Sequence, residues 1–420
     1  MMELKDFKEA LNFAFTTEFW RMGVFWTISL VLSYLQLFTT TLFSRTPISH
    51  PRCSPSPPPP AATTATSTPT TSPTRRPVCI ITGATSGLGA AAAYSLSMEG
   101  FFVVLGVMED IERRNKNAHL KCFQIDLSSF QSILKFKGSF QQWLMDSDLH
   151  SSVQLLINNA GILATTFRLT AEGYDQMMGT NYIGAFSLTK VLLPLLENSP
   201  VPARIVNVTS FTHRSVSDIQ VDKETVSGKS FLKFKKYPCA HIYEYSKLCL
   251  LLFSYELHRH FGVMGKSRQI AVDPGAVKTN IMREVPTCIS YVALLALKLL
   301  GLLQSPENGV RSILDAALAP PMTGPPFKLI IHMESPPSWM TPKPGSNELH
   351  HSSSPGKKQE PLALPRVVSK EISGVYFFGG NGRTVNSSAL SYDTKLAKEL
   401  WDTSCDLFLE LQLAFKDTSF

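Results

Sequence analysis

Short apolar runs separated by helix-length segments dominate the chain from Val78 onward. Runs rich in Val and Ile in this arrangement are typical of strands in a parallel sheet that is buried on both faces. The runs are VCII (78–81), FFVVLG (101–106), LKCFQID (120–126), VQLLINN (153–159), RIVNVTS (204–210) and RQIAVDP (268–274). The pattern predicts an α/β fold, with a Rossmann-like, doubly wound parallel sheet as the single folded domain.

The N-terminal part of the chain follows a different pattern. Residues 22–44 carry no charge, lie between Arg21 and Arg45, and match the roughly 20 residues that cross a bilayer as a helix. We predict a transmembrane helix over 22–44 as a membrane anchor, preceded by an amphipathic lead-in over 1–21. An interfacial helix and a targeting segment are the alternatives.

Two further segments lack apolar periodicity. Residues 45–77 are rich in Pro, Ser and Thr, which predicts an extended linker that holds the folded domain away from a membrane. Residues 322–370 are rich in Pro, Ser and His, and a structureless stretch of this length is unusual inside a compact domain. We interpret 322–370 as a disordered insertion, with a substrate lid as the alternative. It divides one domain into 78–321 and 371–420.

The last part of the chain resumes a folded pattern. Order resumes at the run GVYFFGG (374–380), and residues 395–412 predict a closing helix. The apolar stripe of this helix comprises Leu396, Leu400, Cys405, Leu407 and Leu411.

Charge and cysteine usage narrow the classes of partner. Charged residues make up 17% of the chain, below the roughly 25% of typical soluble proteins, and the net charge of +7 is scattered. The densest basic group, Lys233, Lys235 and Lys236, predicts a solvated loop, so no nucleic-acid partner is expected. The seven cysteines are widely spaced without a Cys-x-x-Cys pair, so we expect a reducing compartment and no metal.

A glycine-rich turn follows the first predicted strand. Residues Thr82–Gly89 read TGATSGLG and precede the helix-forming segment AAAAYSLSM. Glycines let a backbone turn sharply and approach a pyrophosphate, and the N-terminus of the following helix offers free N–H groups to that anion. The segment therefore predicts a dinucleotide-binding turn.

The segment Thr82–Gly89 resembles the fingerprint of the short-chain dehydrogenase/reductase family, and later motifs follow in that family's order. They are Asp126, Asn158-Asn-Ala-Gly161, Asn181, Ser210, Tyr243-Glu-Tyr-Ser-Lys247 and Pro274-Gly275. The resemblance spans residues 78–320, resumes at 371–410, and is closest to the retinol-dehydrogenase-like branch. It implies an oxidoreductase that interconverts alcohols and carbonyls with NAD or NADP. The cofactor-binding residues that it implies are Gly83, Thr85, Ser86, Gly87, Leu88, Gly89, Asp126, Leu127, Asn159, Ala160, Gly161, Tyr243, Lys247, Pro274, Gly275, Val277 and Thr279.

Tyr243 and Lys247 are the central candidates for catalysis. They stand four positions apart, so on a helix they share one face. A phenol is a poor base at neutral pH, and the Lys247 ammonium is expected to lower the pKa of Tyr243. Tyr245 lies two positions from Lys247 and points to another side of the helix.

The remaining candidates depend more on the resemblance. Ser210 ends a predicted strand, where its hydroxyl is expected to hydrogen-bond the substrate oxygen. By the resemblance, Lys247 also binds the nicotinamide ribose, Asn181 holds a water that links Lys247 to solvent, and Thr279 binds the nicotinamide carboxamide.

The residues after the second predicted strand depart from the family pattern. Relatives carry an acidic residue for the ribose 2′-hydroxyl or an Arg for a 2′-phosphate, whereas this chain has VMED at 107–110. The passage from Gly106 to Asp126 is also shorter than in relatives, and no spacing rule supports Arg113 or Arg114 as a replacement. The preference between NAD and NADP stays open.

A continuous apolar segment, CISYVALLALKLLGLLQ (288–304), follows Pro274-Gly275. It predicts a core helix, a lid over an apolar pocket, or a helix that contacts a membrane. Together with the predicted anchor it favours a lipophilic alcohol, aldehyde or ketone as substrate. We expect a cytosol-facing domain on the endoplasmic reticulum, with a plastid or other organelle membrane as the alternative, and leave a homodimer open.

Two classes of function remain from the sequence. The first is an active NAD(P)-dependent oxidoreductase, which the complete set Asn181, Ser210, Tyr243 and Lys247 favours. The second is a catalytically weak Rossmann-fold scaffold or regulatory protein, a variant isoform with an impaired cofactor site. The short second βα unit and the insertion favour this alternative.

Overall fold

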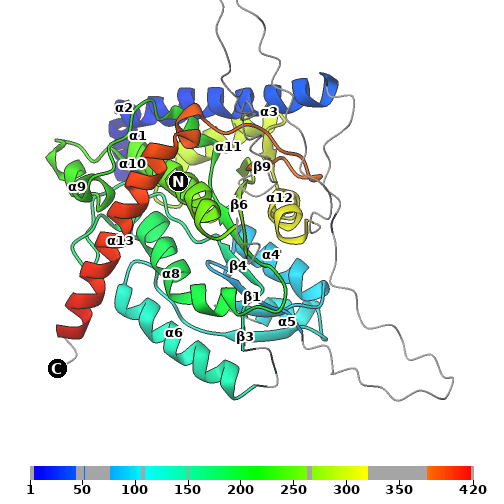
Figure 1. The fold of residues 1–420 in the computed structure, drawn as a ribbon. Coiled ribbons are helices and arrows are strands. Elements are labelled where there is room, and N and C mark those ends of the chain that lie inside the picture. The colour runs from blue at the N-terminus through cyan, green and yellow to red at the C-terminus, as the bar shows by residue number, and fades with distance from the viewer. Residues whose placement is uncertain are drawn as a thin grey trace, which may run out of the picture. The chain divides into compact units, whose positions relative to one another are not determined.

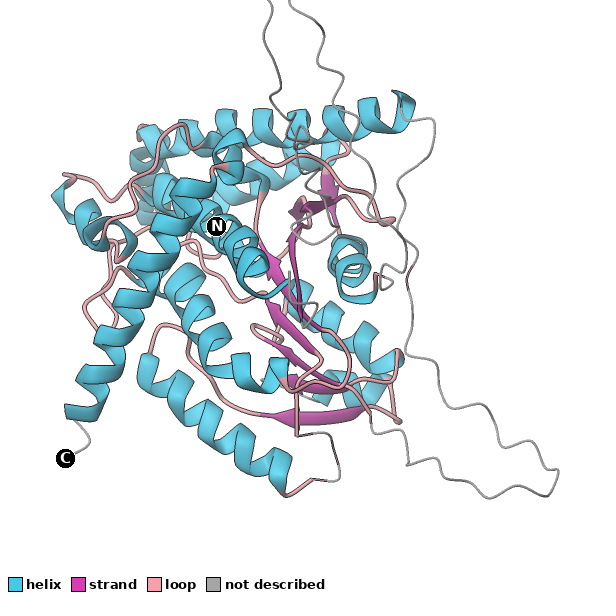
Figure 2. Cartoon of the chain, viewed as in Figure 1, coloured by secondary structure: helices cyan, strands magenta, loops and turns pink. Residues whose placement is uncertain are grey.

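A parallel sheet forms the centre of the fold (Figures 1 and 2). The computed structural model describes residues 4–43, 52, 76–105, 109–147, 149, 151–262, 267–319 and 376–417. In this part of the chain, the strands of the main sheet are β1 (Val78–Ile81), β2 (Phe102–Leu105), β3 (His119–Cys122), β4 (Leu155–Asn158), β5 (Ala203–Val208), β6 (Ser267–Asp273) and β9 (Tyr376–Phe378). Their order is β3-β2-β1-β4-β5-β6-β9, all parallel, as the sequence predicts.

Helices cover both faces of this sheet. The α-helices of the described residues are α1 (Leu4–Ala14), α2 (Thr17–Trp20), α3 (Trp26–Phe43), α4 (Gly87–Met98), α5 (Glu109–Arg114), α6 (Phe130–Met145), α7 (Gln176–Met178), α8 (Gly184–Glu197), α9 (Lys223–Val226), α10 (Cys239–Leu257), α11 (Thr287–Leu299), α12 (Pro306–Leu318) and α13 (Thr394–Asp417). A small second sheet pairs β7 (Ala276–Val277) with β8 (Leu303–Gln304).

Alternation along the strands divides the core into two layers. Because successive strand side chains point to opposite faces, Val78 and Ile80 join the layer formed with α6, α8, α10 and α13. Cys79 and Ile81 join the layer formed with α4 and α12. Both faces are therefore buried, which is why β1 is apolar at every position and β4 at every position but its last.

The C-terminal part completes the same domain. Strand β9 pairs with β6, and Leu400, Leu407 and Leu411 of α13 are buried while Leu396 and Cys405 pack at the edge of the core. The predicted closing helix and its apolar stripe are thus confirmed. The insertion at 322–370 lies outside the described residues, as do all residues of the predicted linker except Arg52, Arg76 and Pro77.

The N-terminal helix, Thr17–Phe43, joins α2, a π-helical turn (Arg21–Phe25) and α3. It spans 27 residues and is long and apolar enough to cross a membrane by length and composition. One side of it packs on the domain, where Leu30 and Leu37 share a cluster with Phe211 and Phe378. The composition of the linker predicts a domain that is held away from the N-terminal helix. In the structure, the helix instead contacts the domain.

The opposite side of the N-terminal helix is apolar and exposed. Its large exposed side chains recur at helical spacing and comprise Trp20, Val24, Phe25, Ile28, Val31, Leu32, Leu35, Phe38, Leu42 and Phe43. The basic group Lys233, Lys235 and Lys236 is also exposed, which confirms the predicted solvated loop.

Candidate active site

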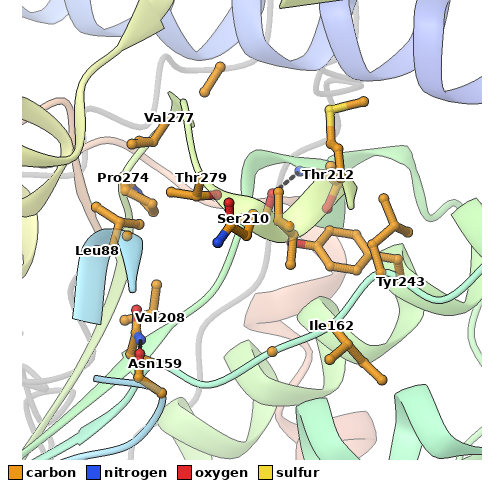
Figure 3. A pocket seen from close by; sticks show the side chains of 18 of the residues that line it. Leu88, Asn159, Ile162, Val208, Ser210, Thr212, Tyr243, Pro274, Val277 and Thr279 are labelled. Atoms are coloured by element: carbon orange, nitrogen blue, oxygen red, sulfur yellow. Dashed lines mark hydrogen bonds between the residues drawn. The ribbon is translucent and has the colours of Figure 1, made fainter. Parts of the chain in front are cut away.

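A cavity of about 360 Å³ lies at the carboxyl ends of the central strands. Its lining includes residues within two positions of the ends of β1, β4, β5 and β6, for example Gly83, Asn159, Ser210 and Pro274. Ligands of open α/β sheets bind at this edge, where the strand order reverses about the first strand. Figure 3 shows Leu88, Pro274, Val277 and Thr279 on one side of the cavity and Tyr243 and Ile162 on another.

Glycines shape the turn between β1 and α4. Gly87 has a φ of +54°, and a Cβ on it would lie 3.0 Å from Thr279 Cγ2. A Cβ on Gly89 would lie 2.2 Å from the Gly83 carbonyl oxygen and 2.6 Å from Asn159 Nδ2. Only glycine fits at these positions, so the backbone stays open to a ligand in front of the α4 N-terminus.

Hydrogen bonds tie this turn to the end of β4. Thr82 Oγ1 accepts from the backbone N–H groups of Asn159 and Ala160, each at 3.0 Å. The Asn159 amide Nδ2 donates to the Thr82 carbonyl at 3.0 Å and to the Gly83 carbonyl at 3.3 Å. The resulting backbone cradle, with the free amides of a helix N-terminus, fits the pyrophosphate of a dinucleotide.

Helix α10 brings Tyr243 and Lys247 to the cavity beside Ser210. Ser210 and Tyr243 both line the cavity (Figure 3), and Ser210 acts on the Tyr243 phenol by lowering its pKa. The Lys247 ammonium donates to the Val208 carbonyl at 3.0 Å and lies 5.6 Å from the centre of the Tyr243 ring. Tyr245 donates instead to the Gln220 carbonyl at 2.5 Å and does not line the cavity, as its position on the helix predicts.

Burial governs the ionisation of this group. Tyr243 is buried, and its pKa is raised well above the usual phenol value, first by burial and then by the nearby Asp273 carboxylate. Burial lowers the pKa of Lys247 to about 8, against the opposing effect of Asp273. The pKa of Tyr243 is thus raised, and not lowered as predicted, because desolvation by burial is the largest effect on it.

Asn181 lies behind the cavity wall. Its Oδ1 accepts from the Ile162 N–H at 2.8 Å, and its Nδ2 donates to the Ile162 carbonyl at 2.9 Å and to Ser246 Oγ at 3.2 Å. A Cβ on Gly161 would lie 3.3 Å from Asn181 Oδ1 and 3.5 Å from Lys247 Nζ. Asn181 and Lys247 thus meet at Gly161, although only Lys247 lines the cavity.

Most of the site residues inferred from the sequence line this one cavity; Gly89, Asp126, Leu127 and Asn181 do not. The Asp126 carboxylate accepts from the N–H and the hydroxyl of Ser128, at 2.9 and 2.7 Å. Leu127 is buried in the core layer on the α6 side of the sheet. Asp126 and Leu127 therefore shape the loop after β3 and do not reach the cavity.

The segment after β2, which is shorter than in relatives, places few charges near the cavity. Val107 and Met108 lie outside the described residues. The Arg114 guanidinium lies 3.9 Å above the Tyr94 ring of α4, and Arg114 is absent from the cavity lining. The described residues after β2 thus give no basis for choosing between NAD and NADP.

Two cavity residues have roles that the sequence did not reveal. Trp26 reaches the cavity from the N-terminal helix, and in the sequence it reads only as an aromatic residue within the predicted span. Asp273 ends β6, is buried, and accepts from the Gly275 N–H at 2.8 Å and the Tyr376 hydroxyl at 2.7 Å. An ionisable residue directly before Pro274 in a buried strand was the available signal for Asp273.

Apolar side chains form much of the remaining wall. Ile162, Met282, Leu294 and Leu297 line the cavity. Helix α11, which supplies two of them, has no buried residue and exposes Tyr291, Val292, Leu295 and Leu299 on its outer side. The core-helix interpretation of this segment is therefore wrong, whereas a lid and a membrane contact both remain compatible with it.

Comparison with known proteins agrees with this geometry. The family model described as short chain dehydrogenase matches residues 77–218. Retinol dehydrogenase 12 of Mus musculus is 32% identical over 252 residues, covering 58% of this chain and 73% of the relative. This chain belongs to the short-chain dehydrogenase/reductase family.

Other relatives place the chain within that family. Polyprenol dehydrogenase of Homo sapiens is 28% identical over 345 residues, covering 79% of this chain and 84% of the relative. Polyprenol dehydrogenase of Mus musculus is 31% identical over 262 residues, covering 59% and 73%. The chain lies in the retinol-dehydrogenase-like branch and is an NAD(P)-dependent oxidoreductase acting on alcohol and carbonyl groups.

Proposed function

We propose that this member of the family interconverts lipophilic alcohols and their aldehydes or ketones at a membrane, using Ser210, Tyr243, Lys247 and Asn181. The observation that carries the proposal is that Ser210, Tyr243 and Lys247 line the same cavity as the glycine cradle. A hydroxyl pair that faces the nucleotide site is what alcohol–carbonyl chemistry requires, since the substrate oxygen must exchange a proton there.

Each residue has a defined part in the reduction of a carbonyl. When bound, the nicotinamide cofactor supplies the hydride that the carbonyl carbon accepts. The Ser210 hydroxyl donates a hydrogen bond to the substrate oxygen, and the Tyr243 phenol gives that oxygen the proton that completes the alcohol. The Lys247 ammonium stabilises the phenolate that remains, and Asn181 holds the Ile162 backbone next to Gly161, which lies beside Lys247.

The protonation states favour the direction of reduction. Because burial raises the pKa of Tyr243, its phenol carries its proton at neutral pH. Lys247, with a pKa of about 8, is still largely protonated there. A protonated acid is ready for carbonyl reduction, whereas alcohol oxidation first requires that Tyr243 lose its proton. Oxidation should therefore need a higher pH than reduction.

The lining of the cavity and the names of the relatives together indicate the class of substrate. Trp26, Ile162, Met282, Leu294 and Leu297 present an apolar surface to the substrate side. Two relatives are named for retinol and polyprenol, both long isoprenoid alcohols. These observations support an extended apolar alcohol or aldehyde.

The exposed apolar side chains of the N-terminal helix and of α11 support membrane association. Contacts between the N-terminal helix and the domain favour a helix in the plane of the membrane, because one side of it packs on the domain and the exposed apolar side is left to face the lipid. We take the cytosolic side of the endoplasmic reticulum as the compartment. Fractionation of cells that express the tagged full chain tests this against a plastid membrane.

A direct assay tests the chemistry. The full chain in nanodiscs is mixed with NADPH or NADH and with retinal or hexanal, and cofactor oxidation is followed. We expect turnover with retinal, a loss of roughly 100-fold or more for Tyr243→Phe, and little change for Tyr245→Phe, a matched variant on the same helix. Failure of the folded wild-type chain to bind either cofactor would favour the scaffold alternative.

A further inference from the structure

The N-terminal helix contacts the helix that carries Tyr243 and Lys247. Helix α10 begins at Cys239 without a side-chain cap of its own. Glu18 Oε2 of the N-terminal helix accepts from the Ala240 N–H at 2.7 Å. A carboxylate at this position satisfies a backbone donor that a helix leaves free and meets the positive end of the helix dipole. The N-terminal helix therefore caps the catalytic helix.

A buried ion pair follows one turn along. The Glu244 side chain is fully buried, and Arg21 Nε donates to its two oxygens at 2.9 and 2.8 Å. Trp26 Nε1 donates to Glu244 Oε1 at 2.6 Å. A buried carboxylate that loses its cation is strongly destabilised, so Glu244 holds the N-terminal helix in place.

Trp26 extends from this contact into the cavity. Its ring centre lies 5.5 Å from that of Tyr243, with 41° between the ring planes, and it lines the cavity. The indole is thus fixed at its nitrogen by Glu244 and presents its ring beside the phenol. It supplies an apolar wall beside the place where a carbonyl must approach Tyr243.

Contacts continue along the N-terminal helix. The hydroxyls of Ser29 and Ser215 lie 3.2 Å apart, and Arg214 Nε donates to Ser33 Oγ at 3.0 Å. Tyr34 accepts from Gln304 Nε2 at 3.0 Å. The same Gln304 nitrogen donates to the Pro274 carbonyl, also at 3.0 Å, at the nucleotide side of the cavity. The helix is bound along the edge of the whole site.

We propose that Trp26 is a specificity-determining residue of the active site and that Arg21 and Glu244 are the residues that position it. The inference rests on the proposed function and deepens it. The N-terminal helix is a wall of the substrate site, and the enzyme works with this helix bound to the domain. A long or flat apolar substrate gains contact with the indole, whereas a small aldehyde does not reach it.

Substrate selectivity tests the role of Trp26. In nanodiscs, kcat/KM is measured for retinal and hexanal with Trp26→Ala, Trp26→Phe and, as the matched control, the exposed Trp20→Ala. We expect Trp26→Ala to reduce the ratio of retinal to hexanal by roughly tenfold to a hundredfold. Trp26→Phe should reduce it less, and Trp20→Ala should leave it unchanged. An unchanged ratio in folded Trp26 variants overturns the proposal.

The positioning role of the ion pair has its own readout. Arg21→Met is expected to shift the same ratio in the same direction, and Arg21→Lys to restore part of it, because a lysine retains the charge. A purely structural role would lower activity toward both aldehydes equally. If Trp26→Ala fails to fold, as judged by circular dichroism, Trp26→Phe and Arg21→Met carry the test.

A crosslink tests the bound helix without using activity. In Ser29→Cys/Ser215→Cys, the two thiols stand where hydroxyls now lie 3.2 Å apart. We expect efficient oxidation to a disulfide in proteoliposomes, measured by mass spectrometry, and a crosslinked enzyme as active as the reduced one. Absence of the crosslink, or activity that the crosslink abolishes, would show that the helix leaves the domain. If the wild type reduces neither aldehyde, the proposed function fails while this experiment still reports on the helix.

Discussion

Replacement of Gly89 by alanine is the sharpest perturbation of the nucleotide site. The added Cβ would lie 2.2 Å from the Gly83 carbonyl oxygen and 2.6 Å from Asn159 Nδ2. Ordinary contact requires more than 3 Å from each, so the turn and the β4 loop must separate. Gly89 itself does not line the cavity, and the substitution therefore acts on the cradle through the backbone.

The magnitude follows from the bonds that this separation breaks. The Asn159 amide donates to the Thr82 and Gly83 carbonyls, and each bond contributes about 1 kcal/mol. With an overpacking cost of about 1 kcal/mol from the displaced Gly83 and Asn159, the cradle loses about 3 kcal/mol. That corresponds to a roughly 100-fold weaker cofactor affinity.

Titration of the full chain with NADPH and NADH, followed by cofactor fluorescence, measures this effect. The control is Gly138→Ala in the middle of α6, where a Cβ meets no atom within 4 Å. It should leave the affinity unchanged and stabilise the fold by up to about 1 kcal/mol. Equal cofactor affinity in wild type and Gly89→Ala would refute the argument that these glycines form the cofactor cradle.

Three further variants have defined expected outcomes. Asp273→Asn removes a carboxylate that raises the pKa of Tyr243, so the acid limb of the pH profile for alcohol oxidation should move to lower pH; an unmoved limb would mean that the carboxylate does not act on the phenol. Burial raises the pKa of Asp273 to about 6, and an inflection near that pH should vanish in the variant. Phe140→Ala deletes a fully buried ring and should cost about 3–5 kcal/mol in chemical unfolding, with a smaller loss pointing to a core that closes the gap. Leu32→Glu with Leu35→Glu should weaken flotation with liposomes, while the equally exposed Leu409→Glu on α13 should not; full flotation of the double variant would place the membrane contact elsewhere.

The local sequence pattern was sufficient to predict the strands of the sheet and many of the residues that line the cavity. Each predicted apolar run overlaps a strand of the main sheet, because burial on both faces favours apolar side chains in the central strands, whereas the edge strand β3 is partly exposed. Tyr243 and Lys247 share a helix face because their spacing matches one helical turn. Gly87 and Gly89 were identifiable from their spacing in the turn, and in the structure a Cβ on either would come too close to neighbouring protein atoms.

The protonation states of the site residues could not be predicted from the local sequence pattern. The spacing of Tyr243 and Lys247 predicts an ammonium that lowers the pKa of the phenol, but burial raises it. Desolvation depends on every atom packed around a group, and these atoms come from distant segments. The influence of Asp273 on both groups likewise follows from its place at the end of β6.

The sequence by itself determined the fold class and predicted which residues of the glycine turn and of the Ser210, Tyr243 and Lys247 group line one cavity, because these follow from local periodicity and from motifs. Only the tertiary structure decided where the N-terminal helix lies. Its composition suits a bilayer, but Arg21 and Trp26 meet Glu244, a residue more than 200 positions away in the chain. A pairing between residues that far apart leaves no periodic signal, and the free energy that favours it arises only when the fold buries Glu244.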